Sequence, residues 1–113
     1  MEVPEFERTL DERGNEVVYF KIHVALGRRK WVLEKRYSNF DDLDKVMRLK
    51  HANLPKLPAK TYFKLKTNEQ IDARRASLHT YLQEIVNRLD MRTNSAFRQF
   101  LEIDEQIPES VTY

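Results

Sequence analysis

Apolar and polar residues alternate over the first third of the chain and then recur at helical spacing. The clearest alternation is Glu16–Leu26, where period-two spacing is typical of a strand with one buried face. Shorter strands are predicted over Val3–Leu10, which Pro4 restricts to a sheet edge, and over Trp31–Tyr37. Turn residues such as Gly14 separate the strands, so we predict a three-stranded antiparallel meander.

The rest of the chain has helical periodicity. Apolar residues three and four apart predict helices over about Asn39–Ala52, Thr67–Leu89 and Ser95–Ile103. Strands followed by helices indicate an α+β fold, with a helical subdomain after the meander. The 113 residues suit a single domain with a core over about 3–103, and we expect the acidic tail 104–113 to be frayed.

Two helix-start signatures are visible. Ser38-x-x-Asp41 and Thr67-x-x-Gln70 have the spacing of a capping box, in which the hydroxyl and the amide three residues later bond reciprocally. The first signature places Arg36 and Tyr37 where a strand ends and a helix begins. A solvated Arg36 paired with Glu34 and a Tyr37 packed into the core are the simplest alternatives.

A proline-rich loop is predicted between the first two helices. Pro55 and Pro58 favour polyproline II backbone, and a stiff segment of this kind can fix the position of Lys60. The alternatives are a connector with solvated lysines, or a Pro-x-x-Pro-x-Lys ligand of Src-homology 3 domains.

Arg74 falls on the apolar side of the second predicted helix. At 100° per residue it lies about 40° from Leu78 and about 20° from Ile85. A buried arginine needs a partner, because an unpaired buried charge is costly. An internal carboxylate would serve, and so would a phosphate or a ring of hydroxyls, which suit the planar guanidinium.

Composition narrows the possible functions. The formal net charge is only +2, which does not suit a nucleic-acid binder, but the charges are segregated into a basic middle and an acidic end. With no cysteine, disulfides and thiolate metal sites are excluded. No apolar run approaches the ~20 residues of a membrane span, so we expect a soluble chain with at most peripheral membrane contact.

Catalysis is not expected. The histidines His23, His51 and His79 fall on different predicted elements, and no pair has metal-ligand spacing. Only two glycines are present, and no glycine-rich phosphate loop is formed. We therefore predict no enzyme, no metal and no cofactor.

Three segments in register resemble the phox-homology (PX) domain, the phosphoinositide-binding module of sorting nexins and related proteins. They read WVLEKRYSNF from Trp31, LPKLPAK from Leu54 and ARRASLHTYL from Ala73. The resemblance spans residues 3–103. Lys35 and Leu54 depart from residues common in the family, at positions not expected to hold the headgroup.

The resemblance implies a role for each of five residues. Arg36 would bind the 3-phosphate of a phosphoinositide, and Tyr37 would stack beneath the inositol ring. Ser38 would lie at the same phosphate, where a helix start favours an anion. Lys60 would reach the 1-phosphate, and Arg74 would bind the 4- and 5-hydroxyls. A neighbouring arginine at 75 is assigned to the fold or to an acidic neighbour.

These roles favour phosphatidylinositol 3-phosphate, although the additional basic residues at 28–30 and 35 keep a broader specificity open. Residues that follow the proline stretch are candidates for membrane contact or insertion, with closure of the core as the alternative: Tyr62, Phe63, Lys64, Leu65 and Lys66. We expect a cytoplasmic module of a longer protein, peripheral on endosomal membranes, with a lipid headgroup and an anionic surface as partners and no nucleic acid.

Overall fold

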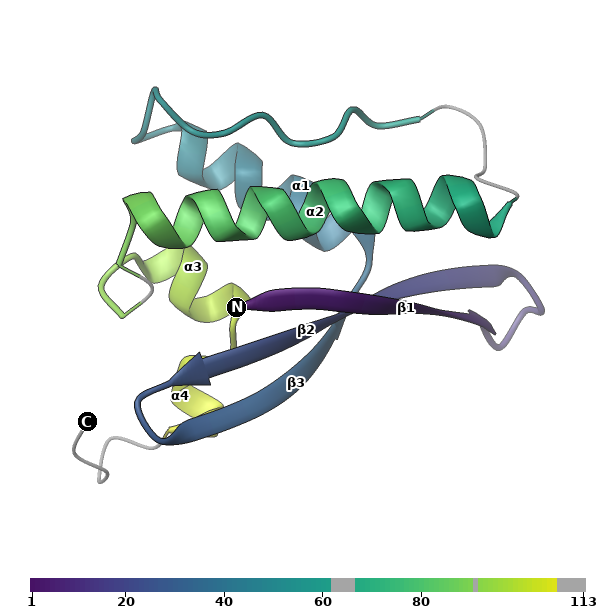
Figure 1. The fold of residues 1–113 in the computed structure, drawn as a ribbon, viewed down its shortest axis with the longest axis horizontal. Coiled ribbons are helices and arrows are strands. Elements are labelled where there is room, and N and C mark those ends of the chain that lie inside the picture. The colour runs from purple at the N-terminus through teal and green to yellow at the C-terminus, as the bar shows by residue number, and fades with distance from the viewer. Residues whose placement is uncertain (62–66, 91, 108–113) are drawn as a thin grey trace.

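A computed structural model describes residues 1–61, 67–90 and 92–107 (Figure 1). The predicted order of three strands followed by helices is confirmed. The elements along the chain are β1 (Glu2–Leu10), β2 (Glu16–Leu26), β3 (Arg29–Lys35), α1 (Tyr37–Arg48), α2 (Asn68–Arg88), α3 (Ser95–Phe100) and α4 (Ile103–Gln106).

The strands form one antiparallel sheet in the order β1-β2-β3, with β2 in the centre. β1 is an edge strand, as Pro4 predicts, and its pairing with β2 shifts between Glu2 and Glu5. At this irregularity, Val3 is bound by α2: its amide donates to His79 Nδ1 at 2.9 Å, and its carbonyl accepts from Arg75 at 2.8 Å. Two backbone groups that β2 does not pair are thereby satisfied, and β1 is fixed to α2.

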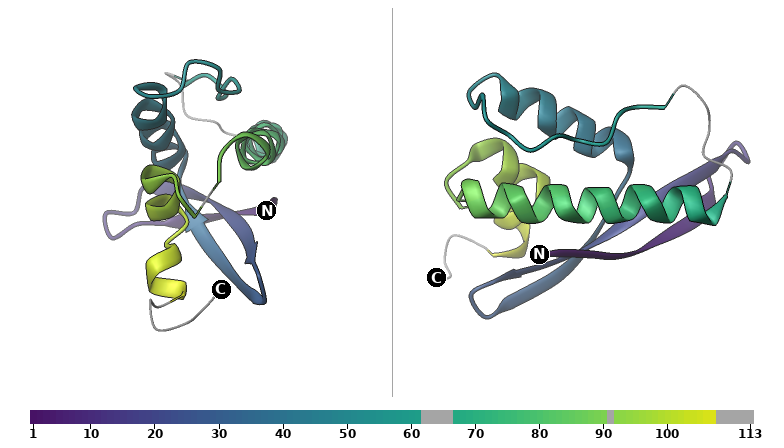
Figure 2. Two further views of the ribbon diagram at one scale, coloured as in Figure 1. Left: turned by 90° about the vertical axis from the view of Figure 1, so that its left-hand side faces the viewer. Right: turned by 45° about the horizontal axis from the view of Figure 1, so that its top comes forward.

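The helices cover one face of the sheet. Figures 1 and 2 show α2 lying along the sheet above β1, with α1 and α3 beside it. Phe40 lies at the centre of the core, with ring centroids of Phe20 and Phe100 at 6.4 and 5.2 Å in edge-to-face geometry. The alternation in β2 is confirmed, since Phe20, Ile22 and Val24 are buried in this core. The sheet and the helices therefore share one hydrophobic core.

The chain end differs from the prediction. Instead of one helix over Ser95–Ile103, the backbone breaks at Glu102, which takes a left-handed conformation with φ 57° and begins α4. Ile107, just after α4, is 3% exposed. The first part of the tail expected to fray is therefore folded, because its apolar residues reach the core.

The connection between α1 and α2 contains Pro55 and Pro58, and its described residues form no helix or strand. Figure 1 shows its described part running above α2, roughly parallel to that helix. The position of the proline stretch matches the prediction, and its polyproline II backbone stays a prediction.

Candidate functional site

The N-terminus of α1, at the junction with β3, is capped by a different residue from the predicted Ser38. Helix α1 begins at Tyr37, with Arg36 as its N-cap in extended backbone. The Arg36 amide donates to Asn39 Oδ1 at 2.9 Å, and the Asn39 amide donates to the Arg36 carbonyl at 3.0 Å. The capping role assigned to Ser38 and Asp41 was wrong, because the helix starts earlier and Ser38 lies within its first turn.

This shift leaves the Arg36 side chain free of capping. It is exposed at the N-terminal end of α1, and it forms no ion pair with any carboxylate in the described part of the chain. The pairing with Glu34 considered as an alternative is not formed. Ser38 is also exposed beside it. A cation and a hydroxyl thus accompany the positive end of a helix dipole, which suits an anion.

Tyr37 joins three segments of the chain. Its hydroxyl donates to the Pro58 carbonyl at 2.5 Å, and the guanidinium of Arg74 lies 4.1 Å from its ring centroid. Burial raises the pKa of the Tyr37 hydroxyl, and the nearby positive charge of Arg74 opposes that shift. The hydroxyl therefore stays a neutral donor at physiological pH, and the ring is held between α1, α2 and the proline connection.

Arg74 is half-buried and has no carboxylate partner among the described residues. Besides the Tyr37 ring, it donates from Nη2 to the Ala59 carbonyl at 2.9 Å. The internal carboxylate left open as an alternative is therefore not found. A guanidinium has five N–H donors, and this carbonyl takes one of them. Donors remain for a hydroxylated or phosphorylated ligand.

Arg75 makes both contacts considered from the sequence, one with an acidic neighbour and one with the fold. It pairs with Asp72 at 2.6 Å and donates to the Val3 carbonyl on β1. The hydrogen bond from Arg75, and then its charge, lower the pKa of the Asp72 carboxyl. Adjacent arginines on α2 thus face different neighbours, one toward the proline connection and the other toward the sheet.

Lys60 follows Ala59 and is exposed, without an ion-pair partner in the described residues. It lines an open polar cleft of about 390 Å³ between α1 and the proline connection, together with Tyr37, Asp41 and Lys56. The structure thus brings Tyr37, Lys60 and Arg74 to one region through Pro58 and Ala59. Arg36 and Ser38 flank that region at the start of α1.

A buried carboxylate that sequence reasoning missed holds the proline connection in place. Asp44 is 8% exposed, accepts from the Tyr81 hydroxyl at 2.7 Å, and pairs with Arg48 at 2.7 Å. Arg48 in turn donates to the Pro55 carbonyl at 2.7 Å. Burial, and then the carboxylate of Asp44, raise the pKa of the Tyr81 hydroxyl. An acid on the apolar face of the predicted first helix was the available signal.

The remaining predicted residues do not join this region. The additional basic residues Arg28, Arg29 and Lys30 lie at the β2–β3 turn, at the opposite end of the molecule from the start of α2 in Figure 1. Lys35 pairs with Glu102 at 3.1 Å. The membrane-contact candidates fall outside the described residues: Tyr62, Phe63, Lys64, Leu65 and Lys66.

The described residues contain no group of three metal-ligating side chains, and none of their helices is long and apolar enough to cross a membrane.

Comparison with known proteins agrees with this fold. The family model described as PX domain matches residues 24–104, which is most of the chain. A designed CISK-PX domain superposes with a TM-score of 0.77 at 30% identity, covering 88% of this chain and 94% of that one. The mouse SNX19 PX domain with bound sulphate ion shares the fold at a TM-score of 0.58 and 17% identity.

Two longer proteins are also similar to this chain in sequence. Human sorting nexin-24 is 37% identical over 81 residues, which are 72% of this chain and 46% of the relative. The rat serine/threonine-protein kinase Sgk3 is 28% identical over 82% of this chain and 19% of the kinase. The chain thus spans less than half the length of these relatives.

The fold and the matched segment define a small α+β module of the lipid-binding class. The chain belongs to the PX domain family, whose members bind phosphoinositides and attach peripherally to membranes.

Proposed function

We propose that this domain recognises phosphatidylinositol 3-phosphate and attaches the protein that carries it to endosomal membranes. The observation that carries the proposal is the Tyr37 ring, held by Pro58 and Arg74 between a helix start with an exposed arginine and a loop with an exposed lysine. An aromatic floor with cations on several sides suits an inositol sugar that bears separated phosphates.

Each contact has a place in this proposal. Arg36 and Ser38 bind the 3-phosphate at the N-terminus of α1, and Lys60 binds the 1-phosphate at the membrane end of the headgroup. Arg74 donates to the 4- and 5-hydroxyls, and its crowding against Tyr37 disfavours further phosphates there. Specificity for the singly phosphorylated lipid would follow from this last contact.

The affinity expected from these contacts is moderate. Hydrogen bonds to charged groups give about 1.5–3 kcal/mol each. Several of them reach roughly the 8 kcal/mol of a micromolar complex before the costs of association are subtracted. Stable attachment would then need the bilayer, to which each nearby lysine adds about 1 kcal/mol. The residues 62–66 are the candidates for that addition.

Substitution of Arg36 tests the proposal. Because this side chain forms no ion pair in the described structure, Arg36→Ala should leave the melting temperature within ~2 °C of wild type. Sedimentation with liposomes containing phosphatidylinositol 3-phosphate should fall at least about tenfold, because a charge-assisted contact is lost. Arg13→Ala, at an exposed turn arginine, is the matched control. Equal sedimentation of the Arg36 variant and wild type would exclude the assigned role.

The Src-homology 3 alternative finds less support. Pro55 is buried, and the carbonyls of Pro55 and Pro58 are already bonded to Arg48 and Tyr37. A proline ligand must offer its surface to an aromatic-lined groove, so this stretch would first have to leave the domain.

A further inference from the structure

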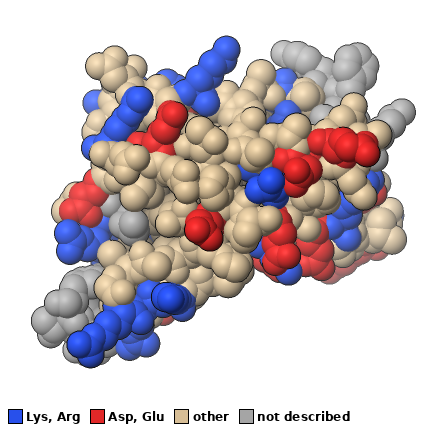
Figure 3. Space-filling model, in the orientation of Figure 1, with Lys and Arg blue, Asp and Glu red and all other residues tan. Residues whose placement is uncertain are grey.

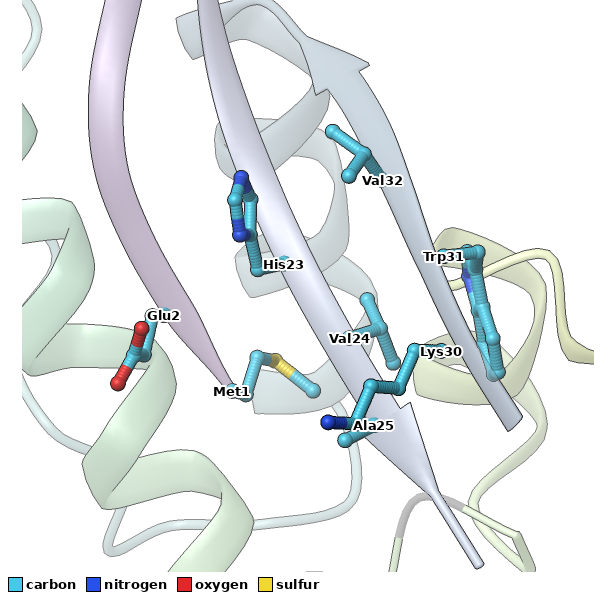
Figure 4. A pocket seen from close by; sticks show the side chains of 8 residues that line it. All are labelled: Met1, Glu2, His23, Val24, Ala25, Lys30, Trp31 and Val32. Carbon is cyan, nitrogen blue, oxygen red and sulfur yellow. The ribbon is translucent and has the colours of Figure 1, made fainter. Parts of the chain in front are cut away.

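The outer face of the sheet carries an apolar groove that no element of the described chain covers. It has a volume of about 420 Å³ and is lined by Met1, Ala25, Val32 and neighbouring residues of β1, β2 and β3. Figure 4 shows these side chains around the groove, with Lys30 and Glu2 at its rim. Its volume is within the range of roughly 300–1,000 Å³ that ligand pockets occupy.

The register of the strands explains why the groove faces away from the helices. His23 pairs with Val32, and Ala25 pairs with Lys30, across β2 and β3. Their chain neighbours Ile22 and Leu33 point into the core, so these pairs point outward. Val32 is 55% exposed in a position where a solvated sheet face usually has a polar residue. Exposed apolar surface with a polar rim is typical of an interaction site.

The β2–β3 turn beside the groove carries a cluster of positive charge. Arg28, Arg29 and Lys30 are consecutive and exposed at the β2–β3 turn, and none forms an ion pair with another described residue. Figure 3 shows blue side chains gathered at the end of the molecule where this turn lies. Three adjacent cations, opposed at the groove by Glu2 alone, favour an anionic partner.

We propose that this face docks an acidic peptide segment of another protein, which places an apolar side chain in the groove and its carboxylates on Arg28, Arg29 and Lys30. A concave pocket admits a side chain, whereas a flat bilayer would not enter it. The groove lies on the outer face of the sheet, whereas Tyr37 begins α1 on the helical side, so peptide and lipid can bind together (Figure 1). The domain thereby links a partner to the membrane.

The test is selection from a random dodecapeptide phage library on immobilised wild-type domain. Enriched sequences should combine aspartate or glutamate with a large apolar residue, and no enrichment of this pattern would overturn the proposal. Representative peptides are then synthesised and titrated against variants by calorimetry.

Substitutions in the groove and at the turn show whether peptide binding depends on these sites or only on the net charge of the domain. Val32→Glu and Arg28→Glu/Arg29→Glu should each raise the peptide Kd by about tenfold or more, because each removes apolar or electrostatic complementarity. The matched control Arg13→Glu/Lys50→Glu changes the same charge at exposed sites elsewhere and should stay within about twofold. Equal binding to wild type and both groove variants would overturn the proposal.

Two further measurements complete the test. Light scattering of the domain alone should give a monomer, whereas a dimer that Val32→Glu dissociates would make a second copy the occupant and overturn the peptide assignment. Liposome binding should be unchanged in the groove variants. The peptide result is independent of the lipid assignment, so either can fail without the other.

Discussion

The guanidinium of Arg74 lies 4.1 Å from the centroid of the Tyr37 ring, and this contact joins the start of α1 to α2. The same two side chains also bind successive carbonyls of the proline connection, Tyr37 that of Pro58 and Arg74 that of Ala59. The aromatic floor and the cation proposed for the sugar hydroxyls therefore support each other before any ligand is present. Preorganisation of this kind lowers the entropic cost of binding.

The ring of Tyr37 should matter more than its hydroxyl. Tyr37→Phe removes the bond to Pro58, for about 1 kcal/mol of stability, but keeps the stacking surface. We expect its lipid affinity to stay within about threefold, while Tyr37→Ala should lose about tenfold or more because stacking is lost. Liposome sedimentation and thermal melting measure the two effects. An alanine variant that binds as well as the phenylalanine variant would contradict the stacking role.

Adjacent arginines on α2 should separate binding from stability. Arg74→Ala should weaken binding to phosphatidylinositol 3-phosphate by about tenfold, because charge-assisted contacts to the sugar are lost. Arg75→Ala should bind normally but unfold more easily by about 1 kcal/mol, since the bond to the Val3 carbonyl is lost. Urea denaturation and liposome binding of both variants make the comparison. The reverse pattern would mean that the roles were assigned to the wrong residues.

The buried carboxylate should stabilise the domain. In Asp44→Asn, the amide cannot accept well from both Tyr81 and Arg48, so the free energy of unfolding should fall by about 1.5–3 kcal/mol. Lipid binding should weaken as well, because Arg48 would hold the proline connection less firmly. Asp42→Asn, at an exposed position of the same helix, should change stability by less than about 0.5 kcal/mol. Denaturant titration is the measurement, and equal stability of the two variants would refute the role of Asp44.

Tyr81 should make the fold sensitive to alkali. Its pKa in the folded state is raised by burial and by Asp44, so the native state keeps a proton that the unfolded chain releases above pH ~10. Stability from this residue is complete below that pH and falls by up to ~1.4 kcal/mol per pH unit above it. Tyr81→Phe cannot ionise, so its unfolding free energy should decline less between about pH 9 and 11. Parallel slopes for the two proteins would contradict this prediction.

Much of the fold is encoded locally. Alternation over residues 16–26 predicted a strand in which Phe20, Ile22 and Val24 are buried as expected, although Val17 is buried out of phase. The Thr67–Gln70 box caps α2 as expected, with Thr67 Oγ1 accepting from the Gln70 amide at 3.1 Å. Such features depend on residues two to four apart, and backbone geometry fixes their relation. The predicted start of α1 was wrong because two side chains in one turn can accept a bond from the amide three residues earlier. Asn39 does so from Arg36, whereas the prediction had Asp41 do so from Ser38.

The sequence by itself determined the order of strands and helices, most of the buried face of β2 and α2, and the resemblance of three segments to one family. Only the tertiary structure decided that Asp44 bonds to Tyr81 and that Arg74 packs on Tyr37 rather than pairing with a carboxylate. It also placed the basic residues 28–30 at the β2–β3 turn, away from these two contacts. Periodicity gives the face on which a residue lies. The partner it finds there depends on how distant segments pack, and no local pattern contains that information.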